Sequence, residues 1–197
     1  MLTDAPHWEH SASGVCTIQS AWEQARVRRP QNGGMKLIWH KWHIPRHSFV
    51  LWLASRGRLR TMDRLHNQQL PQAPCMLCHS HVEDHNHLFF RCSYSAEVWD
   101  LICHKANIQW PSISWGLAWD RAVQNQATSQ HSRILGMVLA ATIYHLWQER
   151  NRRMHNQHYG SPKKMVEEII AQMRTRLATF SERGELMETT RRQWDVQ

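Results

Sequence analysis

The run from Cys75 to Cys92, CMLCHSHVEDHNHLFFRC, contains three cysteines and four histidines. Thiolates and imidazoles are the ligands that zinc takes in proteins, and structural zinc sites hold the ion in a tetrahedron of four such groups. Cys75 and Cys78 are separated by two residues, a spacing that lets both sulfur atoms reach one ion. The run therefore predicts a metal site, with Zn²⁺ as the expected ion.

His87 and Cys92 are the favoured second pair of ligands, which gives the pattern C-x2-C-x8-H-x4-C. The apolar residues 88–90 lie between them and can bury this return segment while its neighbours face the metal. Three other histidines stay open as alternatives: His79, His81 and His85. The most credible of these is His85, because it lies two residues from His87. Four protein ligands leave no position for water, so we expect a structural site.

A nucleobase deaminase is a second interpretation of the same motif. Pro74 precedes the Cys75 and Cys78 pair, and His7-Trp8-Glu9 fits the H-x-E half of the deaminase signature. The two halves are far apart in the chain, and this interpretation leaves the second ligand pair without a role. Three unligated thiols are a third interpretation, which the further histidine and cysteine disfavour.

The elements that must position these ligands are expected to be helices. Apolar residues recur at helical spacing, and no alternating run is long enough for a confident strand. Helical patterns begin near Thr17, Met35, Pro45, Thr61, Ser93, Trp115, Ile134 and Pro162. We therefore predict a mainly α fold, in which a helical domain carries a small zinc-stapled Cys-Cys-His-Cys module.

The two longest predicted helices have different patterns. The helix over 134–156 is apolar in its first half, while its second half, ERNRRMHNQH, is expected to be basic and solvated. Ser161 is the expected N-cap of the last helix, with Pro162 in its first turn. That helix carries one apolar stripe at helical spacing: Val166, Ile169, Ile170, Met173, Leu177 and Phe180.

Charge and cysteine usage restrict the partners and the compartment. The 197-residue chain has a formal net charge of +8, which favours polyanionic partners such as nucleic acid. Its five cysteines are odd in number and partly clustered, unlike a secreted disulfide framework. The first residues lack the apolar core of a signal peptide, and the apolar run 134–147 is too short to span a bilayer. We expect an intracellular protein, with the nucleus as one candidate location.

Arginines around the helix that begins at Pro45 are the candidates for contacting RNA or DNA: Arg46, Arg56, Arg58, Arg60 and Arg64. Two other basic groups are weaker candidates: Arg26, Arg28 and Arg29, and then Arg150, Arg152 and Arg153. Runs of charge are often only solvated surface. No base-reading element is recognisable, so binding would be directed at the nucleic-acid backbone and sensitive to salt.

Two segments carry a family resemblance: IWHKWHIPRHSFVLWLASRGRLRTMDRL at 38–65 and CMLCHSHVEDHNHLFFRCSYSAEVW at 75–99. Together they resemble the reverse-transcriptase zinc-binding domain of plant LINE-type non-LTR retrotransposon polyproteins and of genes derived from them. Matching positions include Trp39, Pro45 and Glu83, and the specific part covers about 36–100. The resemblance implies a module that lies on the C-terminal side of a reverse transcriptase and helps it to hold RNA or DNA.

The chain shows no YxDD-type carboxylate pair and no recognisable endonuclease or ribonuclease H constellation. We therefore expect a non-enzymatic, zinc-stapled module that binds RNA or DNA. The alternative is a protein-interaction scaffold with a purely structural zinc, whose C-terminal helix stripe docks on a protein partner. The expected regions are an N-terminal segment with one helix (1–35), the reverse-transcriptase zinc-binding-like domain (36–106) and a C-terminal helical region (107–197).

Overall fold

The computed structural model describes residues 7–11, 13–26, 34–65, 73–109, 114–124, 129–156 and 159–197. The chain divides into two compact units, Met1–Asn32 (unit 1) and Gly33–Gln197 (unit 2). Every regular element in the described ranges is a helix, apart from one isolated β-bridge. This confirms the predicted mainly α class. Among the described helices, none has the length and apolar character needed to cross a membrane.

Unit 1 contains helix α1 (Ile18–Ala25). A capping box starts the helix, because the Thr17 side chain accepts from the Ser20 backbone and the Ser20 side chain accepts from the Thr17 backbone. Residues 27–29, which continue the helical pattern that begins near Thr17, lie outside the described ranges. No residue of α1 is buried, and Ile18 is 92% exposed.

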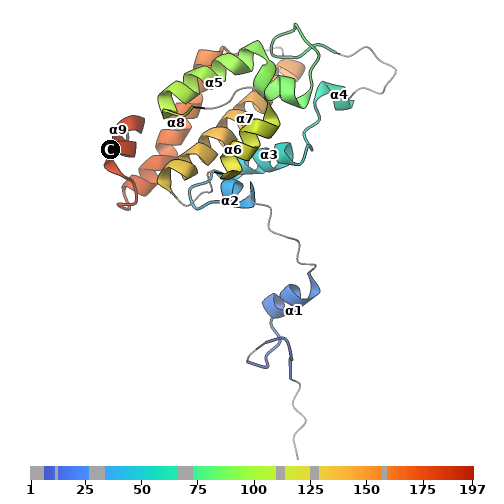
Figure 1. Cartoon of the computed structure of the whole chain (residues 1–197), viewed down its shortest axis with the longest axis vertical. Coiled ribbons are helices and arrows are strands. Elements are labelled where there is room, and N and C mark those ends of the chain that lie inside the picture. The colour runs from blue at the N-terminus through green and yellow to red at the C-terminus, as the bar shows by residue number, and fades with distance from the viewer. Residues whose placement is uncertain are drawn as a thin grey trace, which may run out of the picture. The chain divides into compact units, whose positions relative to one another are not determined.

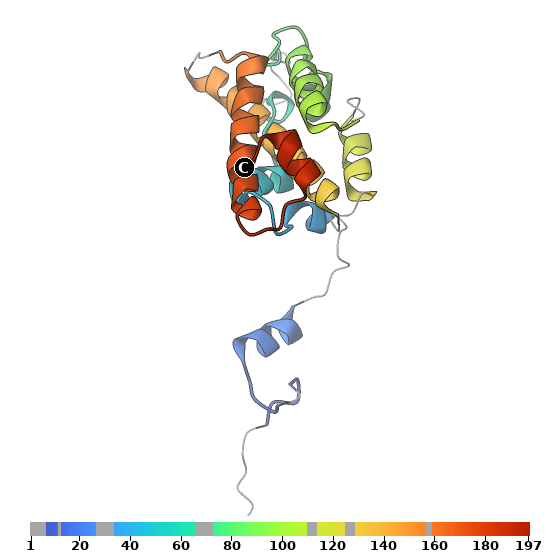
Figure 2. The same cartoon turned by 90° about the vertical axis from the view of Figure 1, so that its left-hand side faces the viewer.

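Unit 2 contains the remaining helices: α2 (Gly34–Ile38), α3 (Pro45–Ser55), α4 (Met62–Leu65), the π-helix η1 (His87–Arg91), α5 (Ser93–Ala106), α6 (Trp115–Gln124), α7 (Gln130–Asn156), α8 (Pro162–Ser181) and α9 (Glu188–Trp194). Helix α7 is central and contacts α2, α3, α5, α6, α8 and η1 (Figure 1). Helix α8 packs against α5, α7 and α9 (Figure 2). Residues on both sides of the predicted boundary at 106–107 therefore pack into one unit.

Local sequence signals set several helix ends. Ser161 Oγ accepts the backbone N–H of Lys164, and Pro162 occupies the first helical position of α8, as predicted. Neither Ser93 nor Ser95, the serines near the predicted start of α5, caps this helix. Cys92 is the N-cap, and the Ser95 hydroxyl instead donates to the carbonyl of Leu88 at 2.6 Å.

The apolar stripe of α8 faces the core of unit 2. Ile169, Met173 and Leu177 are fully buried, and Phe180 stacks on Trp42 with ring centroids 5.0 Å apart. Burial of apolar surface is the main favourable term in folding, so this stripe stabilises unit 2. The scaffold hypothesis expected these side chains to dock on a protein partner. Because they are buried inside unit 2, they cannot form that docking surface.

A group of histidines is buried where α3 meets α7. The His47 ring lies 4.5 Å from the Tyr144 ring and 5.7 Å from the His145 ring. Burial, together with the nearby His145 and Arg46, lowers the pKa of His47 to about 3. Burial also lowers the pKa of His145, and burial with His43 and two arginines lowers that of His40 to about 4. These histidines are neutral in the folded protein at pH 7.

We expect the free energy of unfolding to fall as the pH falls from about 6.5, the unfolded pKa of histidine, toward 4. The folded pKa values lie below the unfolded value, so the unfolded chain binds protons first in this window. Each of these histidines lowers the free energy of unfolding by up to about 1.4 kcal/mol for every pH unit within this window. In urea titrations at several pH values, His47→Leu should have a shallower slope than the wild type. Replacement of the exposed His131 by glutamine is the control, and equal slopes for all three proteins would contradict the prediction.

Candidate metal centre

The four predicted ligands lie together in unit 2. One donor atom from each of Cys75, Cys78, His87 and Cys92 falls within 4.8 Å of all the others. The sulfur atoms of Cys75 and Cys92 are 3.9 Å apart, and Cys78 Sγ lies 3.3 Å from His87 Nε2. With metal–sulfur bonds near 2.3 Å, a tetrahedral ion would separate two thiolates by about 3.8 Å. The donor set and its spacing therefore fit one tetrahedral metal ion.

A tight turn forms the first half of the site. Residues Pro74 and Val82 make an antiparallel bridge, and the backbone N–H of Cys75 donates to the carbonyl of His81 at 2.7 Å. The N–H of Leu77 points at Cys75 Sγ, 3.4 Å away. His79 adopts a φ of 56°, in the left-handed region that few non-glycine residues occupy. This turn, which we call the knuckle (residues 73–83), holds Cys75 and Cys78 side by side.

The π-helix η1 forms the second half of the site. The N–H of Cys92 donates to the carbonyl of His87 at 2.8 Å, a bond between residues five apart. In an α-helix, residues five apart point in directions that differ by about 140°. The wider π turn brings them to the same side, so His87 and Cys92 face the knuckle together. The sequence pattern x4 between these ligands predicted the pair but not the π turn.

Side chains of α5 support the π turn. A π turn leaves backbone carbonyls without their α-helical partners, and buried carbonyls need a donor. The Ser95 hydroxyl donates to Leu88 O, and Trp99 Nε1 donates to Phe89 O at 2.7 Å. The Trp99 ring also stacks on Phe90 with centroids 5.5 Å apart. The start of α5 therefore fixes the half of the site that carries His87 and Cys92.

The alternative histidines lie outside the cluster. The ring of His85 packs against Trp115 and Phe89, at centroid distances of 4.6 and 5.0 Å, and burial lowers its pKa to about 4. His81 is exposed, with its ring centroid 5.5 Å from that of His87. The structure thus brings His87, and not His85, to the three sulfurs. His87 and Cys92 are both part of the cluster, whereas the deaminase interpretation assigned them no role.

The two buried thiols of the cluster interact. The hydrogen bond to Cys92, and then burial, raise the pKa of Cys75, while the hydrogen bond from Cys75 lowers the pKa of Cys92 to about 5. Backbone amides of Ser95 and Tyr94, at the start of α5, also lower the pKa of Cys92. These contacts favour the thiolate form of Cys92, which is the form of cysteine that binds metals.

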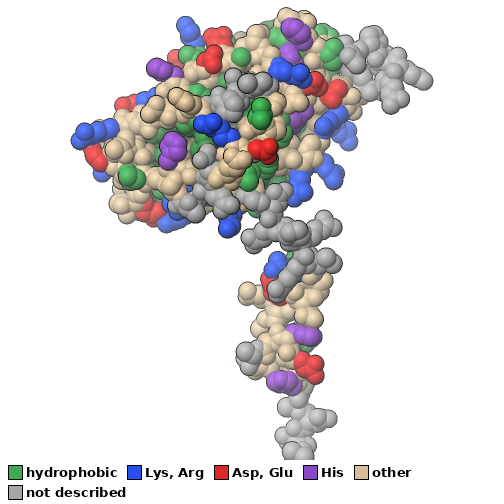
Figure 3. Space-filling model, viewed as in Figure 1, with side chains coloured by type: hydrophobic (Ala, Val, Ile, Leu, Met, Phe, Trp, Pro, Cys, Tyr) green, Lys and Arg blue, Asp and Glu red, His purple; other side chains and the backbone are tan. Residues whose placement is uncertain are grey.

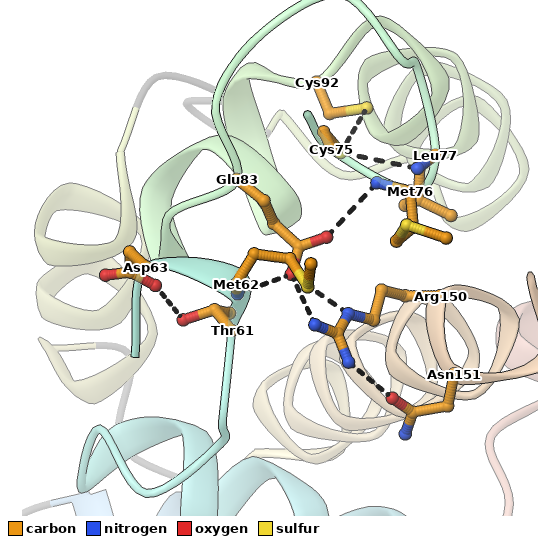
Figure 4. A network of polar contacts seen from close by, with 10 residues as sticks. All are labelled: Thr61, Met62, Asp63, Cys75, Met76, Leu77, Glu83, Cys92, Arg150 and Asn151. Atoms are coloured by element: carbon orange, nitrogen blue, oxygen red, sulfur yellow. Dashed lines mark hydrogen bonds and ion pairs between the residues drawn. The ribbon is translucent and has the colours of Figure 1, made fainter. Parts of the chain in front are cut away.

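Glu83 ties the knuckle to two other parts of unit 2. Its fully buried carboxylate accepts from the backbone N–H groups of Met62 at 3.0 Å and Met76 at 3.3 Å. Arg150 of α7, which is 1% exposed, donates from Nε to Glu83 Oε1 at 3.0 Å and places Nη2 2.9 Å from the same oxygen. Figure 4 shows the Glu83 carboxylate between these three groups.

A second buried ion pair holds the opposite side of the knuckle. Glu149 and Arg153, one turn apart on α7, pair at 2.8 Å. Arg153 also donates to the carbonyl of Leu77 at 2.7 Å and to that of Gly160 at 2.9 Å. The prediction of a solvated second half of α7 is wrong, because Glu149, Arg150 and Arg153 are buried and paired. Arg150 and Arg153 are accordingly removed from the candidates for nucleic-acid contact.

The predicted nucleic-acid-binding arginines have two kinds of environment. Arg46 donates to Gln172 Oε1 at 2.9 Å, and Arg64 donates to the carbonyl of Gly57. Arg56, Arg58 and Arg60 are exposed, and no described residue bonds or pairs with their guanidinium groups. In Figure 3, Lys and Arg side chains line the side of unit 2 where Figure 1 places α3 and α4.

Comparison with known proteins gives one match. Residues 16–99 match a family model described as zinc-binding in reverse transcriptase. All four clustered ligands, Cys75, Cys78, His87 and Cys92, lie within the matched stretch. No curated protein and no solved structure matches the chain.

Proposed function

Because residues 16–99 match a family model described as zinc-binding in reverse transcriptase, we propose that this chain is a non-enzymatic module in which one zinc ion supports a basic surface for RNA or DNA. Three thiolates and one imidazole suit Zn²⁺ better than they suit hard cations such as Mg²⁺ or Ca²⁺. Cys75, Cys78, His87 and Cys92 would fill all four positions of a tetrahedral ion. The ion would then act as a structural cross-link between the knuckle and η1.

The observation that carries the proposal is the link between the metal centre and the basic segment, residues 56–64. Glu83 lies in the chain between Cys78 and His87, and it binds the backbone of Met62 through its carboxylate. Its own carbonyl accepts the N–H of Asp63 at 3.2 Å. A metal that orders the knuckle would therefore also fix the end of the basic segment.

The basic segment presents its cations to solvent. Leu59 and Thr61 are buried, whereas Arg58 and Arg60, which alternate with them, are exposed. Exposed guanidinium groups with no partner in the described ranges are available for phosphate oxygens. Such contacts fix a nucleic-acid backbone without reading its sequence.

The test is salt-dependent binding of a fluorescent single-stranded RNA, measured by anisotropy. Each phosphate contact on a single strand contributes about −0.7 to the slope of log affinity against log salt. Replacing Arg56, Arg58 and Arg60 together by glutamine should make the slope shallower by about 2 and weaken binding. The control replaces three exposed cations elsewhere in unit 2: Lys163, Lys164 and Arg183. Wild-type binding that does not change with salt would refute the proposal.

We further propose that the module derives from the C-terminal region of a plant LINE-type retrotransposon polyprotein and acts inside the cell, where RNA and DNA are present. The two resembling segments and the family match support this origin. All five cysteines are free, and thiolate ligands require reducing conditions. A protein partner at α8 remains a second proposal, but it would have to bind the exposed side of that helix, because the apolar stripe is buried.

A further inference from the structure

Helix α3 carries an exposed aromatic ring, with a partly buried ring packed on it, next to the basic segment in the chain. Phe49 is 52% exposed although it is a large apolar residue. Its ring packs on that of Trp52, with centroids 5.9 Å apart and an angle of 27° between the planes. Trp52 also packs against the core, so it holds one side of Phe49 while solvent reaches the other.

Arginines lie at both ends of this pair. Arg46, three residues before Phe49, and Arg56, four residues after Trp52, are both exposed. Phe49, Trp52 and Arg56, the C-cap residue, are three and four residues apart and share one side of the helix, and we call these three side chains the α3 ridge; Arg46 is instead bonded to Gln172 on α8. The rise of a helix gives a separation of about 15 Å between the two arginine Cα atoms.

We propose that the α3 ridge binds unpaired nucleotides, with a base stacked on Phe49 and the adjoining phosphates at Arg56 and the basic segment. Exposed aromatic rings next to cations are the arrangement by which proteins hold single strands, since every base has a face that can stack. In a duplex these faces are already covered by neighbouring bases. The ridge therefore selects single-stranded RNA or DNA over a duplex.

This inference rests on the proposed function and names the form of nucleic acid that the basic surface takes. The charge of the ridge argues for a nucleic acid over an apolar protein partner. Arg56 has no partner in the described part of the chain, and Arg58 and Arg60 extend the same positive surface. An apolar partner would leave these cations without compensation.

The experiment compares a single-stranded RNA with a blunt-ended RNA duplex of equal phosphate number, using anisotropy at one salt concentration and then over a salt series. Phe49→Leu keeps an apolar side chain but removes the ring. We expect it to weaken single-strand binding about tenfold, to leave duplex binding unchanged and to leave the salt slope unchanged. Leu117→Ala on α6, a residue that is 54% exposed, is the control and should bind like the wild type.

A second measurement locates the stack directly. Iodouridine in the single strand cross-links under light to an aromatic ring that it contacts, and peptide mapping should place the link at Phe49 or Trp52. If the wild type binds with a clear salt slope but Phe49→Leu binds the single strand equally well, the α3 ridge is refuted and the proposed function stands. If the affinity of the wild type for both RNAs does not fall as salt rises, the proposed function itself is refuted.

Discussion

Replacement of Cys75 by serine should abolish binding of one zinc equivalent and disorder the knuckle. A serine hydroxyl is a poor zinc ligand, and the binding energy of a structural zinc, about 10–16 kcal/mol in zinc-finger peptides, is also folding energy. The loss should be local, because α3, α7 and α8 pack together without the cluster. Elemental analysis should find less than one zinc per chain, and hydrogen exchange should speed up at the amides of Leu77 and Cys92.

The matched control for this change is Cys16→Ser, which makes the same substitution at an exposed cysteine of unit 1. It should keep a full zinc equivalent and unchanged exchange in unit 2. Removal of metal from the wild type by a chelator should reproduce the Cys75→Ser exchange pattern and weaken RNA binding. A metal-free wild type with fully protected knuckle amides would show that the ion has no structural role.

Replacement of Glu83 by glutamine is expected to lower the free energy of unfolding by about 3–5 kcal/mol. The change keeps the shape of the side chain but leaves Arg150 as a buried cation without a counter-charge. It also weakens the bonds that hold the Met62 and Met76 amides. Urea unfolding followed by circular dichroism measures the change.

Two further proteins separate the ion pair from a general packing effect. Arg150→Met on its own should cost a similar amount, and adding it to Glu83→Gln should cost less than the sum, because the double variant buries no unpaired charge. The control is Glu188→Gln, which breaks an exposed pair with Arg192 on α9 at 2.9 Å. Exposed pairs contribute about 0–1 kcal/mol, so an equal loss at Glu83 and Glu188 would contradict a buried clamp.

Spacing along the sequence favoured the ligand set Cys75, Cys78, His87 and Cys92 but left His79, His81 and His85 as alternatives. Two cysteines separated by two residues can both reach one ion, and a histidine and a cysteine a short distance along the chain can complete the tetrahedron. Periodic apolar residues likewise predicted the helical class, and Ser161 with Pro162 predicted the start of α8, since these are local preferences of the backbone.

The π turn depended on tertiary contacts. Its free carbonyls are stabilised by Ser95 and Trp99, which lie on the next helix, so the pattern of η1 alone could not separate His87 from His85. The packing of Trp115 against His85 completes the distinction, and Trp115 lies 30 residues away in the chain.

The charged residues of α7 are a second feature that the local sequence could not predict. Local composition predicts a solvated basic segment, because isolated charges are costly to bury. Burial became favourable only where Glu83, from a segment 67 residues away, met Arg150, and where Leu77 met Arg153. Long-range pairing therefore removes Arg150 and Arg153 from the arginines that are available to a partner, and only the tertiary structure could show this.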